Sequence, residues 1–463
     1  MAVLKESVLE KDRVKPFGMQ DKIGYMLGDL GNDMFFQFIG GYLMLFYTDV
    51  LGITAGAVGT MLIVARMWDA INDPMMGTFI DRRPVGKHGK FRPYLIYAAL
   101  PVTCMGFLVF TKIPGIPENM KLVYAYVTYI GFGMCYTAYN IPYGSLASVM
   151  TNDPVERTSL STFRSIGAMI AGIVIMLIVP KLVFVDGVAS ASGFMKAAAI
   201  FVVLSNLCYF AAFKMTTERV KHEVNKNKEK TSFVDTVKTL VKNRALIGIM
   251  VATFGMMVSM FAVQALTPYL YKDYFQAPGL ISLAGALGMV SSFIILPVLS
   301  PLVAKFGKKE LAAGTMVVGI VAYLALFLIP TKNPYVFMGL NFVASVGTGF
   351  FNVLIWALVG DAIDYQAYLS GKREEGIVYA SYSLVRKIGQ AIAGGVGGFA
   401  LTFIGYQSGA AVQSAEVAEG IRNIVTILPM VATVLAFISM AFIYNLSKSK
   451  LAEINEEMAA KRV

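Results

Sequence analysis

Histidine, cysteine and charge are all scarce in this 463-residue sequence. The two histidines, His88 and His222, fall in charged connections, which makes a histidine metal cluster or a Ser-His-Asp triad improbable. The three cysteines, Cys104, Cys135 and Cys208, lie within apolar runs and offer neither a disulfide framework nor a CxxC metal site. Helix packing is their expected role. We therefore expect a protein that is not an enzyme and holds no cofactor.

Apolar side chains are abundant instead. Hydrophobic residues make up 56% of the chain and charged residues only 15%, whereas soluble domains carry about a quarter charged residues. The N-terminus is charged and polar, so we expect no signal peptide. Apolar segments of spanning length run near 25–50, 56–80, 93–111, 121–150, 162–186, 193–215, 244–272, 279–305, 311–331, 334–365, 376–405 and 421–447. This pattern predicts an all-α membrane protein with twelve transmembrane helices.

Lysine and arginine gather in the connections after the second, fourth, sixth, eighth and tenth segments. The alternate connections, such as "DVLGIT" and "YQSGAAVQSAEVAEG", have almost none. By the positive-inside rule, both termini and the central loop are predicted to be cytoplasmic. The net charge of +11 is then an orientation signal, and no basic face of the kind that binds nucleic acid is expected.

The charged interval 216–243 divides the segments six and six. It predicts an N-terminal six-helix bundle (1–215), a cytoplasmic central loop (216–243), a C-terminal six-helix bundle (244–447) and a cytoplasmic tail (448–463). Short Gly-Lys turns, "DRRPVGKHGKFRPY" and "VAKFGKKE", recur at the equivalent place in each half. Two duplicated six-helix halves, with substrate near the midplane between them, are the plan of the major facilitator superfamily.

Ionisable residues inside spanning segments indicate function, because charge facing lipid is unfavourable. Arg66, Asp69 and Asp73 share one helical stripe in the N-terminal bundle, and Asn72 flanks it. Two carboxylates one turn apart could share Na⁺ with further oxygens, or could bind a proton as a coupled pair. The alternative is a purely structural ion pair between Arg66 and one aspartate. The other candidates are Asp33, Arg164 at the start of 162–186, Asp361, Asp364, Arg386 and Lys387.

Segment 121–150 mixes rings with hydrogen-bonding groups. Tyr136, Asn140 and Gly144 follow one another at four-residue intervals and so share a helical face. Such a face suits a sugar, which has apolar faces and a hydroxyl rim. Aromatic packing between helices is the alternative.

Several motifs together resemble the glycoside–pentoside–hexuronide:cation symporters, whose best-known member is the melibiose carrier. They are "LGDLGNDMFF", "YTDVLGI", "VARMWDAINDPMMG", "HGKFRPY", "YTAYNIPYGSL" and "GDAIDYQAY…REEGIVYASYSLVRKIGQAIAGG", in order along nearly the whole chain. The resemblance implies a cation site of Asp69, Asn72, Asp73 and Thr137. It also implies a sugar site that includes Asp33, Tyr136, Arg164 and Lys387, and a cytoplasmic gate of Asp361, Asp364 and Arg373.

The chain departs from the melibiose carriers in its sugar site. Asn140 stands in place of an aspartate, Gly144 in place of a stacking tryptophan, and Tyr382 in place of an amide. The pattern is closer to the glucuronide and xyloside branch. We therefore include Asn140, Tyr382 and Ser383 among the expected substrate-binding residues. Trp356 is a further candidate as an aromatic platform, with packing as its alternative role.

The resulting prediction is a bacterial cytoplasmic-membrane symporter that imports a glycoside, with glucuronides first and xylosides second. Its expected partners are the glycoside, a coupling cation and the lipid bilayer, and we expect a functional monomer. Na⁺ is favoured because the site offers several oxygens, and H⁺ remains open. The alternatives are a cation-coupled lysolipid transporter of the same superfamily and a proton-coupled carrier of a neutral oligosaccharide. A membrane enzyme is a further class, for which the sequence lacks a nucleophile-base pair.

Overall fold

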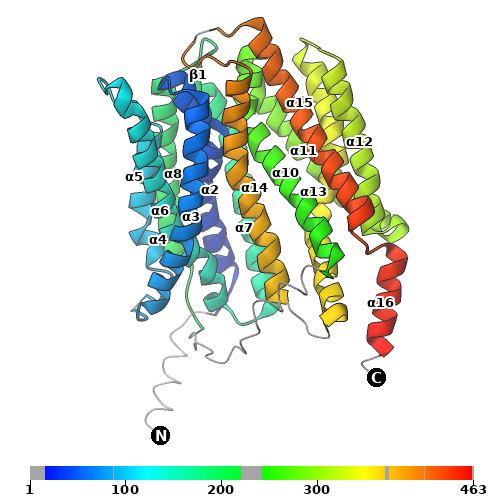
Figure 1. The fold of residues 1–463 in the computed structure, drawn as a ribbon. Helices are drawn as coiled ribbons and strands as arrows, with labels where there is room; N and C mark the ends of the chain where they lie inside the picture. The colour runs from blue at the N-terminus through cyan, green and yellow to red at the C-terminus, as the bar shows by residue number, and fades with distance from the viewer. Residues whose placement is uncertain (1–15, 87, 221–241, 371–374, 411, 461–463) are drawn as a thin grey trace, which may run out of the picture. The chain divides into compact units, whose positions relative to one another are not determined.

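The computed structural model describes residues 16–86, 88–220, 242–370, 375–410 and 412–460, and helices make up almost all of it (Figure 1). The helices of the first half are α2 (Met19–Leu45), α3 (Ala55–Arg82), α4 (Tyr94–Tyr97), α5 (Ala99–Val109), α6 (Glu118–Met150), α7 (Pro154–Val183) and α8 (Ala191–Met215). Those of the second half are α10 (Arg244–Tyr269), α11 (Ile281–Phe306), α12 (Lys308–Leu328), α13 (Pro334–Ser370), α14 (Glu375–Phe403), α15 (Ala415–Ile438) and α16 (Lys448–Ala460).

Helix occupies each of the twelve predicted apolar segments. In the described part of the chain, seven helices are long and apolar enough to cross a membrane: α7, α8, α10, α11, α12, α13 and α15. Helices α2, α3 and α14 fall outside this group and carry Asp33, Asp69, Asp73, Arg386 and Lys387. Polar side chains lower the hydropathy of a helix whether or not it spans.

The start of the fifth segment is a correction. Helix α7 begins at Pro154 and not near 162, so Arg164 lies ten residues inside the helix and not at its start. The Asp153 side chain caps the helix by accepting a hydrogen bond from the Val155 amide, and proline is well suited to the first helical position. These polar capping residues read as loop in a hydropathy profile.

Short elements of three kinds complete the fold. Strands β1 (Phe184–Val185) and β2 (Val188–Ala189) form a small hairpin after α7, a local exception to an all-α chain. Its turn residues Asp186 and Gly187 both have positive φ (51° and 80°), as a tight Asp-Gly hairpin requires. Helices α2, α10 and α15 each end in a π-helical turn, namely η1 (Phe46–Val50), η2 (Leu270–Tyr274) and η4 (Ser439–Ile443), and a 3-10 turn, η3 (Pro278–Leu280), precedes α11.

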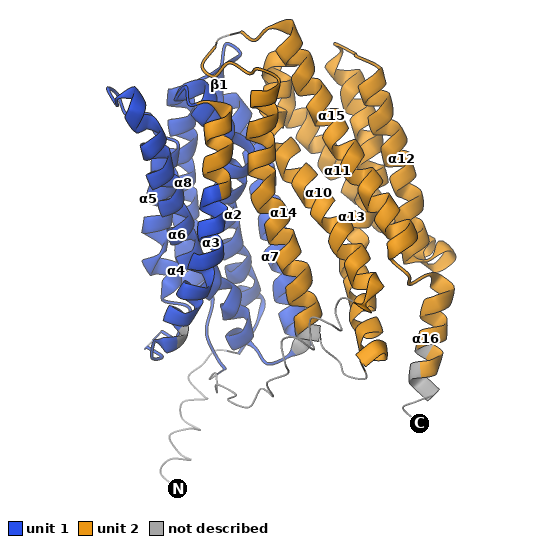
Figure 2. Ribbon diagram, in the orientation of Figure 1, with its two compact units in different colours: residues 1–53, 64–226 blue, residues 54–63, 227–463 orange. Residues whose placement is uncertain are grey.

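The chain divides into two compact units (Figure 2). Unit 1 holds residues 1–53 and 64–226, and α2 packs there against both α7 and α8. Two buried tyrosines set the register of α6 on α2, because Tyr139 donates to the Gly28 carbonyl (3.1 Å) and Tyr143 to the Tyr25 carbonyl (2.6 Å). This register determines which residues of α2 the polar side chains of α6 meet.

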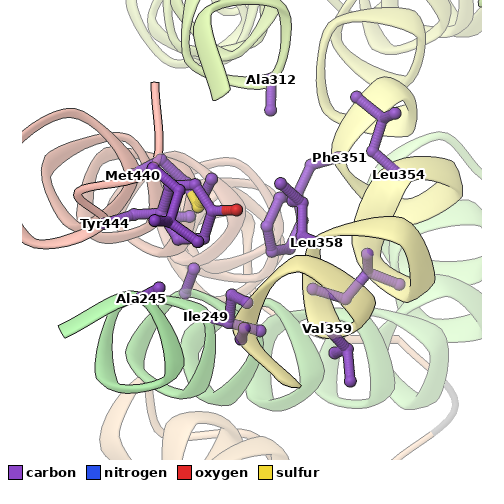
Figure 3. Packing of buried hydrophobic residues seen from close by; sticks show 14 of the residues in the cluster. Ala245, Ile249, Ala312, Phe351, Leu354, Leu358, Val359, Met440 and Tyr444 are labelled. Atoms are coloured by element: carbon purple, nitrogen blue, oxygen red, sulfur yellow. The ribbon is translucent and has the colours of Figure 1, made fainter. Parts of the chain in front are cut away.

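Unit 2 holds residues 54–63 and 227–463, so the first turns of α3 group with it. Its core is an apolar cluster contributed mainly by α10, α12, α13, α15 and η4, with single residues or pairs from α11, α14 and α16. Ile249, Phe351, Leu358 and Met440 are buried in it (Figure 3). Gly307 separates α11 from α12 with φ of 95°, a left-handed conformation that favours glycine.

Candidate functional site

Asp69 and Asp73 of α3 face α6 in unit 1. Thr137 Oγ1 donates a hydrogen bond of 2.9 Å to Asp73 Oδ1. One turn earlier in α3, Asp69 lies close to Gly133 of α6. A Cβ atom added at position 133 would be only 2.9 Å from Asp69 Oδ1. The pairs 69/73 and 133/137 each have a spacing of four residues, so both carboxylates lie against the same face of α6. Glycine at 133 leaves the room that Asp69 occupies.

Arg66 balances one of these two carboxylates. Its Nη1 lies 3.3 Å from Asp69 Oδ2, with both side chains partly exposed. The ion pair considered from sequence as the structural alternative is therefore present, while Asp73 is held by the hydroxyl of Thr137. Asn72 is 5% exposed, and its amide nitrogen has no hydrogen-bond partner among the described residues. A buried amide without a hydrogen-bond partner is rare in folded proteins, and a bound ion or water is one explanation for it.

A second polar group joins α2 and α6 in the same unit. Asn32 Nδ2 donates to Tyr136 Oη (3.0 Å) and, more weakly, to Asn140 Oδ1 (3.5 Å). Phe36 stacks on the Tyr136 ring with centroids 5.8 Å apart. The predicted face of Tyr136 and Asn140 thus meets Asn32 and Phe36 of α2. Sequence reasoning did not single out these two residues.

Acidic residues of α2 meet α7. Asp33 accepts from Gln37 Nε2 (3.3 Å), which also donates to the Ala168 carbonyl of α7 (2.9 Å). Arg164 Nε donates to Asp29 Oδ1 (2.9 Å), and its charge also interacts with Asp33. Asp29 was missed from the sequence, although its four-residue spacing to Asp33, and from Asp33 to Gln37, places the three on one helical face.

The remaining predicted substrate residues lie in unit 2, on α13 and α14. Trp356 stacks on Tyr379 (6.0 Å between centroids) and meets Tyr382 edge-on (5.6 Å). The Arg386 guanidinium lies over the Trp356 ring, 5.4 Å from its centroid. Tyr382 is buried, Ser383 is partly buried and Lys387 is exposed.

Two of the predicted gate residues, Asp361 and Asp364, lie in the last third of α13. Asp361 Oδ1 accepts a hydrogen bond of 2.6 Å from Lys308 Nζ of α12, a partner that the sequence did not suggest. Asp364 lies one turn further along α13 and makes an interaction of its own. Arg373 lies outside the described residues.

The basic loop after α3 is tied to the end of α8 by Glu218. The Glu218 carboxylate accepts backbone hydrogen bonds from Lys90 (2.8 Å), Phe91 (2.7 Å) and Arg92 (2.7 Å). The next residue, Arg219, forms a bidentate ion pair with Asp21 of α2, with both nitrogen–oxygen distances at 2.9 Å. Sequence reasoning treated this stretch as part of the central loop and missed both contacts.

Comparison with known proteins places the chain in a family. The family model for MFS/sugar transport protein matches residues 24–448. An uncharacterized symporter, YnaJ, of Bacillus subtilis is 33% identical over 451 residues, 96% of each chain. The glucuronide carrier protein homolog of Escherichia coli is 33% identical over 438 residues, 94% of each chain.

A solved structure supports the fold. The inward-facing bacterial homolog of the human lysosomal transporter Spinster superposes with a TM-score of 0.66 at 11% identity, covering 93% of this chain and 98% of that one. With the family match, this likeness confirms an all-helical membrane protein of the major facilitator fold. The chain therefore belongs to the MFS/sugar transport family, the glycoside–pentoside–hexuronide:cation symporters, and is a multi-pass membrane transporter and not an enzyme.

Proposed function

We propose that this protein is a cation-coupled symporter that imports a glycoside by alternating access. The observation that carries the proposal is the carboxylate pair Asp69 and Asp73 near the middle of α3, which lies against Gly133 and Thr137 of α6. Tyr136 lies on α6 directly before Thr137 and bonds Asn32 of α2. One helix therefore carries both a candidate cation ligand and a candidate sugar contact, which is what coupling requires.

The cation site consists of Asp69, Asn72, Asp73 and Thr137, and Na⁺ fits it best. Two carboxylates, an amide and a hydroxyl supply several oxygens and fixed negative charge, which a hard monovalent cation favours. A proton needs no such set of ligands. Arg66 pairs with Asp69, so in this proposal the cation competes with the arginine for that carboxylate.

Coupling follows from the geometry of α6. Cation binding draws Asp73 and Thr137 toward a common ligand and so fixes the α3–α6 contact. This orders Tyr136 and Asn140 for the sugar, together with Asp33 and Arg164. By linkage, the sugar raises cation affinity by the same factor that the cation raises sugar affinity.

The membrane arrangement that we propose has twelve transmembrane helices in two pseudo-symmetric six-helix bundles, 1–215 and 244–447. The central loop 216–243, the tail 448–463 and both termini are cytoplasmic, as the distribution of lysine and arginine indicates. Asp361, Asp364 and Arg373 form a cytoplasmic gate whose ion pairs break and re-form during transport. We propose that the protein works as a monomer in the bacterial cytoplasmic membrane.

The substrate that we propose is a β-glucuronide, with neutral xylosides second. Asn140 removes a negative charge that a galactoside carrier has at this place, and a relative at 33% identity is described as a glucuronide carrier homolog. Trp356, Tyr382, Ser383 and Lys387 of unit 2 are further substrate-binding residues in this proposal. The polar side chains of α2 and α6 argue against the lysolipid alternative, which needs an apolar opening.

The test is uptake into proteoliposomes with and without an inward Na⁺ gradient, compared for radiolabelled glucuronide, xyloside and lysolipid. We expect concentrative glucuronide uptake that depends on Na⁺. Asp73→Asn should abolish concentrative uptake of the glucuronide, although the protein should still insert into the membrane. Asp186→Asn, in the exposed β-hairpin, is the matched control and should behave as wild type. Undiminished concentrative uptake by Asp73→Asn, or uptake of lysolipid alone, would contradict the proposal.

A further inference from the structure

Arg386 of α14 is a charged residue with an unusual environment. It lies three residues, or about 5 Å along the helix axis, from the middle of α14. In the membrane arrangement proposed above, this position is inside the bilayer. Among the described residues it has no hydrogen bond and no ion pair, and its Nε is buried without a partner. Arg66 and Arg164 of unit 1, by contrast, each hold an aspartate.

Aromatic rings lie beside this guanidinium. Its central carbon lies 5.4 Å from the Trp356 centroid and 5.9 Å from the Tyr382 centroid. Tyr379 braces the other end of the cluster by stacking on Trp356. Ring contacts of this kind leave the N–H groups of an arginine without hydrogen-bond acceptors, and a guanidinium is the fork that recognises a planar oxyanion through two parallel hydrogen bonds.

The energetics require a counter-charge. A cation at membrane depth is unfavourable unless it meets an anion or a water-filled cavity, and lipid cannot supply either. Trp356 is 49% exposed, so the cluster has an open side. A ligand that carries an oxyanion beside an apolar sugar face would satisfy Arg386 and cover the Trp356 ring at once.

We propose that Arg386 is the specificity-determining residue that binds the oxyanion of the substrate, a carboxylate or a sulfonate on the sugar, with Trp356 as the adjoining wall. The inference rests on the proposed function, because it assumes a glycoside substrate, and it assigns the substrate's charge to one residue. Arg386 is then a selector for anionic over neutral glycosides and is not needed for cation coupling.

The experiment uses ligands matched in all but charge. Counterflow in proteoliposomes is measured for a p-nitrophenyl β-glucuronide, the corresponding β-glucoside and the corresponding 6-deoxy-6-sulfo-glucoside. Arg386→Gln should weaken the glucuronide about tenfold or more, the value of a charge-assisted bidentate contact, and change the glucoside less than about twofold. Arg386→Lys should recover only part of the loss, because an ammonium lacks the planar fork.

Two further measurements separate the outcomes. Arg244→Gln, at the exposed start of α10, is the matched control and should leave all three ligands unchanged. Trp68 and Trp356 are the only tryptophans, so in a Trp68→Phe background the fluorescence of Trp356 reports binding directly. Glucuronide should change that fluorescence in the Arg386 protein, and in Arg386→Gln the same change should need about tenfold more glucuronide or more.

The possible results of these experiments distinguish the role of Arg386 from the proposed function. Equal losses for charged and neutral ligands, or no loss for either, would overturn the role of Arg386 and leave glycoside transport standing. Preference for the sulfonate over the carboxylate would keep Arg386 as the oxyanion receptor and change the substrate. A wild-type protein that carries none of the three ligands would instead contradict the proposed function itself.

Discussion

Thr137→Val is the substitution that best distinguishes Na⁺ coupling from H⁺ coupling. It keeps the shape of a buried side chain and removes the hydroxyl that donates 2.9 Å to Asp73 Oδ1. If Na⁺ is the coupling ion, the substitution removes a ligand oxygen and Na⁺ binds more weakly. If H⁺ is the coupling ion, it removes a donor that favours the ionised carboxylate, so the proton binds more tightly. The two hypotheses therefore predict opposite signs.

The size of the effect follows from the hydrogen bond. A hydrogen bond to a charged group contributes about 1.5–3 kcal/mol. We expect the lower end, since Asp73 is only partly buried, and about 1.5 kcal/mol is roughly tenfold in affinity. The Na⁺ concentration for half-maximal transport should thus rise about tenfold. Under proton coupling, transport would instead persist to higher pH.

The assay is substrate counterflow by purified protein, measured against Na⁺ concentration and then against pH. Thr128→Val is the control, because Thr128 is a buried threonine on the same helix whose hydroxyl bonds the Tyr124 carbonyl (2.8 Å). The control should leave the Na⁺ dependence unchanged. A Thr137→Val protein with wild-type dependence on both Na⁺ and pH would refute the assignment of Thr137 to the cation site.

Three further predictions concern other contacts. Gly133→Ala should weaken cation binding about threefold to tenfold, because the new methyl group displaces the Asp69 carboxylate by a few tenths of an ångström. Gly144→Ala is the control and should leave cation binding unchanged, because there is open space around Gly144. Equal cation affinities for the two variants would contradict this account. Glu218→Gln should speed hydrogen exchange of the backbone amides at 90–92 by about tenfold, because a charged acceptor of three backbone hydrogen bonds becomes neutral. Unchanged exchange, measured by mass spectrometry, would show that the Glu218 carboxylate does not hold this loop. Asn140→Asp should weaken the binding of a glucuronide far more than that of a neutral glycoside in competition assays. The reason is that one added charge at about 6 Å, at an effective dielectric near 20, contributes about 3 kcal/mol of repulsion. Equal losses of affinity would show that charge at position 140 does not select the substrate.

Several features could be read from the sequence because they depend on local pattern. Apolar runs of spanning length identified the segments that became helices, and family motifs identified the transporter class. The stripe of Asp69 and Asp73 needed only the helical period. Boundaries were less accessible where polar capping residues extend a helix, as Asp153 and Pro154 do for α7.

Which partner a polar side chain meets on another helix was decided by tertiary structure. Nothing local in the sequence indicates that Thr137 bonds Asp73, because 64 residues separate them and the contact depends on how α6 packs on α3. The pairing of Arg164 with Asp29 likewise follows from the packing of α7 on α2, and the sequence could not distinguish Asp29 from Asp33 as its partner. The period of a helix fixes which side chains share a face, whereas the rotation and register of packed helices fix what that face meets.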